Sequence, residues 1–321
     1  MTSTRAKPKP VRRRQSLLRR SSRPPAEDRN SLIGHSRVIP YLLSGPAIFM
    51  VSLLLAFPVL YAIWQSAYKA EVIGGETEFV GLQNYIDLFR DPAFLWAMNR
   101  TAIFVFGCLI LGLSLALVFA FALNKAGQRL RFLRGITIVP YLVSGVAAAV
   151  MFRLMFNAEF GQVNRTLEFF GINGPEWFST PGLAMVATII AQVWTDLPLA
   201  VLLILGGLQT IEPSLLDAAS VDGATGWHRA WYVSIPLITP QLAIATVWFS
   251  YGTLTSLGVV LALTGGGPMD ATRTVPIHLY ETAFVELRRN EALAIVVVIL
   301  ALNAILTLIY TTVSRRYDLR S

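Results

Sequence analysis

Hydrophobic residues are gathered along this chain into six long blocks that shorter polar segments separate. Each block holds about 20 residues or more, the length that a helix needs to cross some 30 Å of hydrocarbon. The blocks are apolar all round, whereas strands of a membrane β-barrel alternate apolar and polar positions. We therefore predict an all-α membrane protein with six transmembrane helices, at residues 38–65, 101–123, 136–156, 182–208, 237–263 and 292–312.

Four prolines lie inside these blocks: Pro46, Pro58, Pro140 and Pro198. In a soluble protein each would end a helix, but in a membrane bundle neighbouring helices can satisfy the carbonyl groups that proline leaves unpaired. We therefore expect kinks at these positions and not helix ends.

Charge is distributed unevenly along the chain. Hydrophobic residues make up 54% and charged residues 14%, against roughly 45–50% and 25% in soluble domains. The net charge of +8 arises mainly in residues 1–37, a tail rich in Arg, Pro and Ser. This tail has little to bury, so we predict a disordered cytoplasmic segment that is attracted to membrane lipid and not to nucleic acid. A regulatory or partner-docking role is the alternative.

The positions of Lys and Arg also predict an orientation, because cytoplasmic loops retain positive charge. The tail and the loop at residues 124–135 are basic, while the loop at residues 66–100 is rich in acids. With six spans, both termini are then cytoplasmic. The segment at residues 268–291 opposes this pattern, because it is predicted to lie outside yet contains Arg273, Arg288 and Arg289.

Several kinds of chemistry have no signal in the sequence. Cys108 is the single cysteine, and the three histidines are far apart, so we expect no metal site. No phosphate-binding glycine loop or nucleophile motif is present, which predicts that the chain is not an enzyme, has no ATPase site and binds no cofactor.

The polar segment at residues 211–240 lies between the fourth and fifth blocks. Pro213 is suited to the first turn of a helix, and Asp222 and Gly223 are suited to a turn after it. Thr225 can then cap a second helix, which bears Trp227. Two interpretations remain open from composition alone. The segment is either an amphipathic helix on the membrane or a helix that docks into another protein, where small alanines permit close approach.

A resemblance favours docking. Asp217, Ala218, Ala219 and Gly223, followed near residue 235 by Ile and by Pro236 or Pro240, resemble the EAA loop of bacterial ABC importer permeases, with Asp in place of the usual Glu. Residues 79–101, 139–171 and 263–284 resemble carbohydrate-type permeases, and Thr-Gly-Gly-Gly-Pro is typical of the maltose and glycerol-phosphate importers. The likeness covers residues 41–317. It fails at residues 288–291, where the family has a small-residue stretch.

The resemblance implies a multi-pass permease subunit with a type I ABC importer bundle in the bacterial inner membrane. The expected cargo is a sugar, a polyol or a sugar phosphate. The expected partners are a second homologous permease, two ATP-binding subunits that use ATP and Mg, an extracytoplasmic solute-binding protein and membrane lipid. The resemblance implies coupling to the ATPase through Asp217, Ala218, Ala219, Asp222, Gly223 and Pro236, and a last outer loop at Gly265, Gly266, Gly267 and Pro268.

Polar residues within the predicted spans indicate a substrate path, because such residues are unfavourable in lipid unless they face a cavity or a partner. The candidates are Gln192, Trp194 and Asp196 in the fourth block and Ser250, Tyr251 and Thr253, with Thr255 and Ser256, in the fifth. Interhelical hydrogen bonding is the alternative, and it is favoured for Ser and Thr. A secondary transporter with an ion site at Asp196, or an intramembrane enzyme, is less favoured, because the spans show one clear carboxylate, no repeat and no nucleophile–base pair.

Overall fold

The computed structural model describes residues 38–69, 77–126 and 131–318, so the predictions for the basic tail at residues 1–37 lie outside the described residues. Two units divide the chain, Met1–Leu55 and Ala56–Ser321. In the first, the described residues form the beginning of α1 (Val38–Gln65), whose end belongs to the second.

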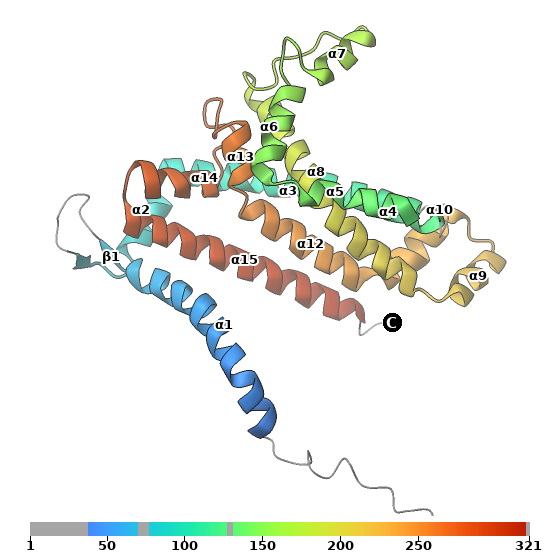
Figure 1. Cartoon of the computed structure of the whole chain (residues 1–321), viewed down its shortest axis with the longest axis horizontal. Coiled ribbons are helices and arrows are strands. Elements are labelled where there is room, and N and C mark those ends of the chain that lie inside the picture. The colour runs from blue at the N-terminus through green and yellow to red at the C-terminus, as the bar shows by residue number, and fades with distance from the viewer. Residues whose placement is uncertain (1–37, 70–76, 127–130, 319–321) are drawn as a thin grey trace, which may run out of the picture. The chain divides into compact units, whose positions relative to one another are not determined.

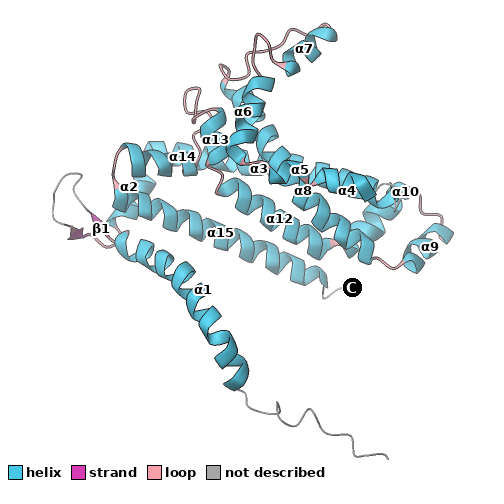
Figure 2. Ribbon diagram, viewed as in Figure 1, coloured by secondary structure: helices cyan, strands magenta, loops and turns pink. Residues whose placement is uncertain are grey.

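Four helices form the body of the second unit (Figure 1). The helix α3 (Pro92–Ala126) packs along α8 (Pro181–Thr210), and α12 (Thr239–Leu254) packs against both and against α15 (Arg289–Asp318). The described residues are almost entirely helical, as predicted, with one short antiparallel pair, β1 (Tyr68–Lys69) and β2 (Glu78–Phe79), as Figure 2 shows.

Four helical segments of the described chain are long and apolar enough to cross a membrane, at residues 44–65, 92–126, 181–210 and 289–312. Two further segments qualify only as bent pairs of helices. Residues 134–155 bend by 97° and residues 226–254 by 76°. The structure thus has four candidate spans, or up to six if each bent pair is one span.

The third predicted block is not one kinked helix. It is divided into α4 (Arg131–Thr137), α5 (Val139–Leu142) and α6 (Gly145–Met155). Pro140 lies in the first turn of α5, where an N–H group would have no acceptor within the helix, so proline costs no hydrogen bond there. Ser144 has extended backbone and its side chain accepts a hydrogen bond from the Ala147 N–H, so it starts a new helix. The other three prolines stay inside continuous helices, as predicted.

The fifth predicted block, residues 237–263, is also divided. The helix α12 ends at Leu254, and α13 (Gly258–Leu263) begins after three intervening residues. At this end the Thr255 N–H donates to the Tyr251 carbonyl at 3.1 Å and the Ser256 N–H to the Thr253 carbonyl at 3.2 Å. The last bond spans three residues, so the helix closes in a tighter turn.

Short helices and turns connect these elements. They are α2 (Gln83–Arg90), α7 (Gln162–Phe169), α9 (Pro213–Val221), α10 (Gly226–Arg229), the π-helical turn η2 (Ala230–Ser234), α11 (Ile235–Leu237), α14 (Val275–Tyr280) and the π-helical turn η3 (Glu281–Val285). Buried asparagines hold two of the connections. Asn84 donates to the carbonyls of Ser66 and Tyr68, while Asn164 accepts from the Trp177 indole and donates to two carbonyls.

Small residues allow α3 to approach its neighbours closely. Ala116 and Ala120 are fully buried, and a Cβ atom added to Gly112 would lie 2.5 Å from the ring of Phe249, which is itself fully buried in α12. Small residues at helix contacts are typical of membrane bundles, where close packing drives association. The contact between α3 and α12 therefore depends on the absence of a side chain at residue 112.

We expect Gly112→Ala to destabilise the protein by about 1–3 kcal/mol, because Phe249 has to move out of a filled space. The matched control is Gly206→Ala in α8, where an added Cβ meets nothing within 4 Å. Thermal unfolding of the detergent-purified protein should show a lower midpoint for the first variant only. Equal midpoints would contradict this account of the α3–α12 contact.

Candidate coupling segment and membrane path

The predicted docking segment forms a helix, a tight turn and a second helix. Pro213 lies in the first turn of α9, as expected. After Asp222 the chain turns at Gly223, whose φ of +82° is a left-handed conformation that residues with a Cβ rarely adopt. The Ala224 N–H then donates to the Ala219 carbonyl at 3.0 Å. Thr225 caps α10 by accepting from the His228 N–H, as predicted.

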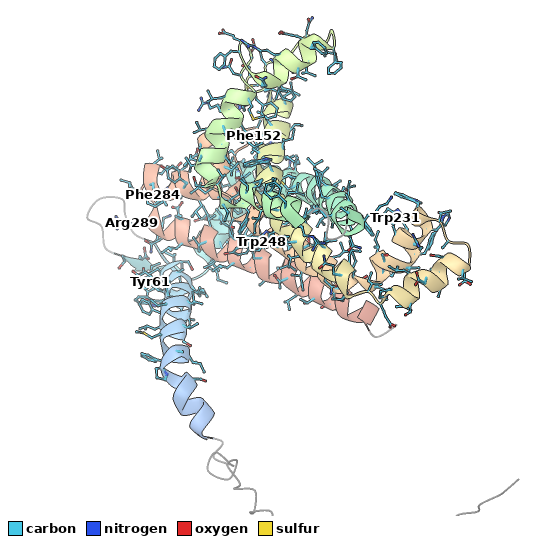
Figure 3. The ribbon with its side chains drawn as sticks, turned by 45° about the vertical axis from the view of Figure 1, so that its right-hand side comes forward. Tyr61, Phe152, Trp231, Trp248, Phe284 and Arg289 are labelled. Atoms are coloured by element: carbon cyan, nitrogen blue, oxygen red, sulfur yellow. The ribbon has the colours of Figure 1, made fainter. Side chains whose placement is uncertain are left out.

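One side-chain bond joins the two helices across this turn. The Arg229 guanidinium of α10 donates to the Ser220 hydroxyl of α9 at 2.6 Å. Trp227 and Trp231 lie next to each other on the second helix, with ring centroids 5.6 Å apart, and both are exposed. Figure 3 shows Trp231 on this segment, which projects from the bundle.

The two alanines of the segment differ in environment. Ala218 lies on an exposed face of α9 together with Leu215, which is 48% exposed, and Val221, which is 87% exposed. Ala219 is partly covered. The two carboxyl-bearing residues, Asp217 and Asp222, are exposed as well. So is Pro236, a predicted partner contact in the first turn of α11. The segment thus presents a short apolar face with carboxylates beside it.

Three polar side chains meet where α8 passes the junction of α12 and α13. The Gln192 amide donates to the Asp196 carboxylate at 2.7 Å and accepts from the Ser256 hydroxyl at 2.6 Å. Gln192 is buried and Asp196 half-buried. Trp194 is half-buried on the same helix, with its ring edge-on to Phe152 of α6 at 5.6 Å. The arrangement is a hydrogen-bonded chain between two helical segments.

The remaining predicted path residues lie elsewhere. The Ser250 hydroxyl donates to the Tyr310 hydroxyl of α15 at 3.1 Å, and Thr253 donates only to carbonyls of its own helix. Both side chains are buried. Tyr251 is 55% exposed. This pair could not be predicted from the sequence, because Ser250 and Tyr310 are 60 positions apart.

The predicted outer loop at residues 264–274 is tightly folded. Gly265 and Gly266 have positive φ values, and the Gly267–Pro268 peptide bond is cis. The Thr272 hydroxyl donates to the Gly267 carbonyl at 2.8 Å and lies 2.7 Å from the Thr264 hydroxyl. At the base of the loop, the Val275 N–H donates to the Thr101 hydroxyl of α3 at 2.8 Å. These bonds fix the loop to the end of α3.

Two of the three arginines that opposed the predicted orientation are paired with acids. Arg273 donates to Glu281 through Nε at 2.6 Å and Nη2 at 2.5 Å. Arg288 pairs with Glu286 and with Glu291. Their charges are therefore largely balanced within the same segment.

His278 is a titratable group of this segment that the sequence did not single out. It is buried beside Phe94, and its Nδ1 atom has no partner among the described residues. Burial, and then the positive charge of Arg273, lower the pKa of its imidazole. The described residues contain no group of three or more His, Cys, Asp or Glu residues that could hold a metal ion.

These features define a multi-pass, helical membrane protein with a projecting helix–turn–helix segment. The chain belongs to the family of binding-protein-dependent transport system inner membrane components, whose family model matches residues 36–319. It is accordingly a multi-pass protein of the inner membrane, and the predicted membership of the ABC importer permeases is confirmed.

The chain aligns with curated relatives over nearly their whole length. The sn-glycerol-3-phosphate transport system permease protein UgpA of Agrobacterium fabrum is 31% identical over 85% of this chain and 95% of its own. The sulfoquinovosyl glycerol permease protein SmoG of the same organism is 32% identical over 88% and 92%. The trehalose/maltose permease protein MalF of Thermococcus litoralis is 31% identical over 86% and 93%.

The fold is also similar to that of a solved structure. A chain of a bacterial ABC transporter involved in the import of the acidic polysaccharide alginate superposes with a TM-score of 0.73, covering 87% of this chain and 95% of that one. The sequence identity is 20%, so this likeness concerns the fold alone.

We expect Gly223→Ala to loosen the turn after α9 by about 1 kcal/mol, because alanine is strained at a φ of +82° although nothing lies within 4 Å of the added Cβ. Hydrogen exchange at the Ala224 amide, which closes the turn, should become roughly five-fold faster. Gly226→Ala is the control, since that site has space and no positive φ. Equal exchange in both variants would show that the turn does not depend on Gly223.

Proposed function

We propose that this chain is a transmembrane permease subunit of an ATP-driven importer for a sugar, a polyol or a sugar phosphate. The observation that carries the proposal is the projecting α9, which has an exposed apolar face and a fixed turn behind it. Relatives named for glycerol phosphate, sulfoquinovosyl glycerol and trehalose or maltose transport support the class of cargo.

In this proposal the bent segment at residues 134–155 crosses the membrane as one span, and α12 and α13 together form another. With the four long helices this gives six spans and two cytoplasmic termini. Breaks within a span are tolerable where protein groups satisfy the freed backbone, as Ser144 does at the start of α6. Residues 264–291 are then on the outer side, with Arg273 and Arg288 paired to acids of the same segment. The coupling segment at residues 211–240 then lies on the cytoplasmic side.

The coupling segment would dock into a cytosolic ATP-binding subunit. Leu215, Ala218 and Val221 offer an apolar contact face, and the carboxylates of Asp217 and Asp222 beside it can pair with basic groups. The bond between Arg229 and Ser220 makes α9 and α10 move together. ATP and Mg would be bound by two such partner subunits, and hydrolysis there would drive transport.

The remaining subunits follow from the same proposal. A second homologous permease would complete the translocation path, and an extracytoplasmic solute-binding protein would deliver the cargo to the outer face. The loop at residues 264–274 is a candidate contact for that delivery, because its fold is fixed by Thr272 and by Thr101 at its base.

The path for the cargo would pass Gln192, Asp196 and Ser256. Hydroxyl, amide and carboxylate groups can exchange hydrogen bonds with the hydroxyls of a sugar, and Trp194 offers a ring close by. We assign Ser250 and Thr253 to the support of the bundle, since their hydroxyls are bonded to Tyr310 and to helix carbonyls. Tyr251 remains a candidate path residue because it is exposed.

Reconstitution tests the proposed function as a whole. The chain, co-expressed with the permease, ATP-binding and solute-binding subunits of its own transport system, should show uptake that requires ATP and all the subunits. Uptake by this chain alone, driven by an ion gradient, would identify a secondary transporter and refute the proposal.

We expect Ala218→Trp to abolish coupling while leaving membrane insertion intact, because a large ring on the exposed face of α9 prevents close docking. Solute-stimulated ATPase activity of the complex should fall at least ten-fold, which corresponds to about 1.4 kcal/mol. Ala218→Ser keeps the small size and serves as the control. Normal stimulation in a well-expressed Ala218→Trp complex would exclude docking through this face.

We expect Asp196→Ala to reduce uptake about ten-fold or more with normal assembly of the complex. The change removes a group from the proposed path and leaves the Gln192 amide without its acceptor. Asp196→Asn keeps an acceptor and removes the charge, so it separates the two effects. Ser250→Ala, which alters the bond to Tyr310, is the control for a purely structural defect. Unchanged uptake kinetics in Asp196→Ala would assign Asp196 to bundle support.

A further inference from the structure

We propose that a glycerophospholipid binds at the N-terminal end of α3, with its phosphodiester group in a cavity beside Arg100 and one acyl chain along α3. The cavity measures about 280 Å³ and lies between the first turns of α3 and the loop at residues 264–274. Ala93 and Ala97 line it from α3, with Trp96 and Arg100 beside them. Asp270 and Arg273 line it from the loop.

Arg100 is a cation that has no acidic partner among the described residues. Its guanidinium lies 5.5 Å from the centre of the Trp96 ring, and it makes no hydrogen bond or ion pair with any residue that the structure describes. The side chain is half-buried, so its charge is only partly screened by water. Such a group is suited to a phosphate oxygen, which accepts strong charge-assisted hydrogen bonds from guanidinium.

The opposite wall of the cavity is arranged differently. Arg273 is held by Glu281 and lies 4.0 Å from Asp270, so its charge is already balanced. Asp270 is 72% exposed at the rim and can accept a hydrogen bond from a hydroxyl or an ammonium group. Phosphate bound at Arg100 with a polar head at Asp270 would match both walls.

An exposed apolar stripe runs from this cavity along α3. Trp96, Ile103 and Ile110 are seven residues apart and thus share one face of the helix. They are 59%, 42% and 71% exposed, and Phe106, 63% exposed, lies beside them. The stripe is continuous with the cavity through Trp96, which lines it. A ligand with a phosphate and a long apolar chain fits the two features together.

The length of α3 places the cavity at the depth of lipid head groups. The helix has 35 residues and is about 52 Å long, whereas the hydrocarbon layer is about 30 Å thick. Arg100 is the ninth residue of α3, so it lies about 12 Å from the helix start. Trp and Arg residues at this depth are typical of membrane interfaces. Arg100 lies at this depth in either leaflet and whatever the protein transports.

The binding of phosphatidylglycerol to the purified protein, together with any subunits that co-purify, tests the proposal by native mass spectrometry. Arg100→Gln should weaken one binding event about ten-fold or more, because a charge-assisted hydrogen bond is lost. Arg165→Gln is the control, since Arg165 is an exposed cation of α7 outside the cavity. Arg100→Lys should retain part of the binding. Equal binding in all of these proteins would overturn the proposal.

Two further measurements identify the ligand. Diacylglycerol with the same chains lacks phosphate and should not compete, and neither should free glycerol phosphate, which lacks the chains. Effective competition by glycerol phosphate would indicate a site for a soluble oxyanion and would overturn the lipid assignment. In otherwise unchanged protein, Ile103→p-benzoylphenylalanine should photolabel an acyl chain. Labelling of another protein subunit instead would show that a partner covers the stripe.

Discussion

The structure depends on one constraint, which is that every backbone N–H and C=O group within a membrane needs a partner from the protein. A helix without an internal proline, such as α3, satisfies it by itself within its length. Where a helix stops inside an apolar block, a side chain or a nearby turn has to take over. Ser144 does this at the start of α6, and the Ser256 N–H donates to the Thr253 carbonyl just after α12. The two breaks are therefore closed by local hydrogen bonds.

The same breaks place polar groups inside the bundle. If α12 continued as a helix through residue 258, Ser256 would follow the helical path of its neighbours. Because the helix ends at Leu254, Ser256 reaches the Gln192 amide of α8 at 2.6 Å. A Cβ at Gly252 would lie 3.0 Å from the Asp196 carboxylate, so the absence of a side chain at this position also leaves room for the hydrogen-bonded polar groups. The interruption of a span and the candidate path are thus consequences of one local sequence.

Much of the helical architecture could be predicted from periodicity and length, because apolar blocks of this size have few alternatives in a bilayer. The block at residues 182–208 corresponds closely to α8, and Pro198 stays inside it. The blocks at residues 136–156 and 237–263 were predicted as single helices, and those predictions are wrong. Hydropathy does not register Ser144 as a cap, since serine is small and weakly polar, and it does not register the turn at residues 253–256.

The candidate site likewise has features that could be predicted from the sequence and features that could not. The turn at Gly223 and the cap at Thr225 could be predicted, because each depends on neighbours in sequence. The pairing of Ser250 with Tyr310 and of Ser256 with Gln192 depends on contacts between residues 60 and 64 positions apart, which a single sequence does not specify. The difference between Ala218 and Ala219 likewise follows from how α9 sits against α10, so composition could not separate the two alanines.

Two arginines of the segment at residues 268–291 have acidic partners, whereas Arg100 of α3 does not among the described residues. Arg273 is bound by Glu281, and Arg288 by Glu286 and Glu291, so the segment carries its own counter-charges. Arg100 differs, because its guanidinium has only the Trp96 ring among the described residues. Arg100 lies at the end of an exposed apolar helix face, and the partner that we propose for it is a phosphate of the bilayer.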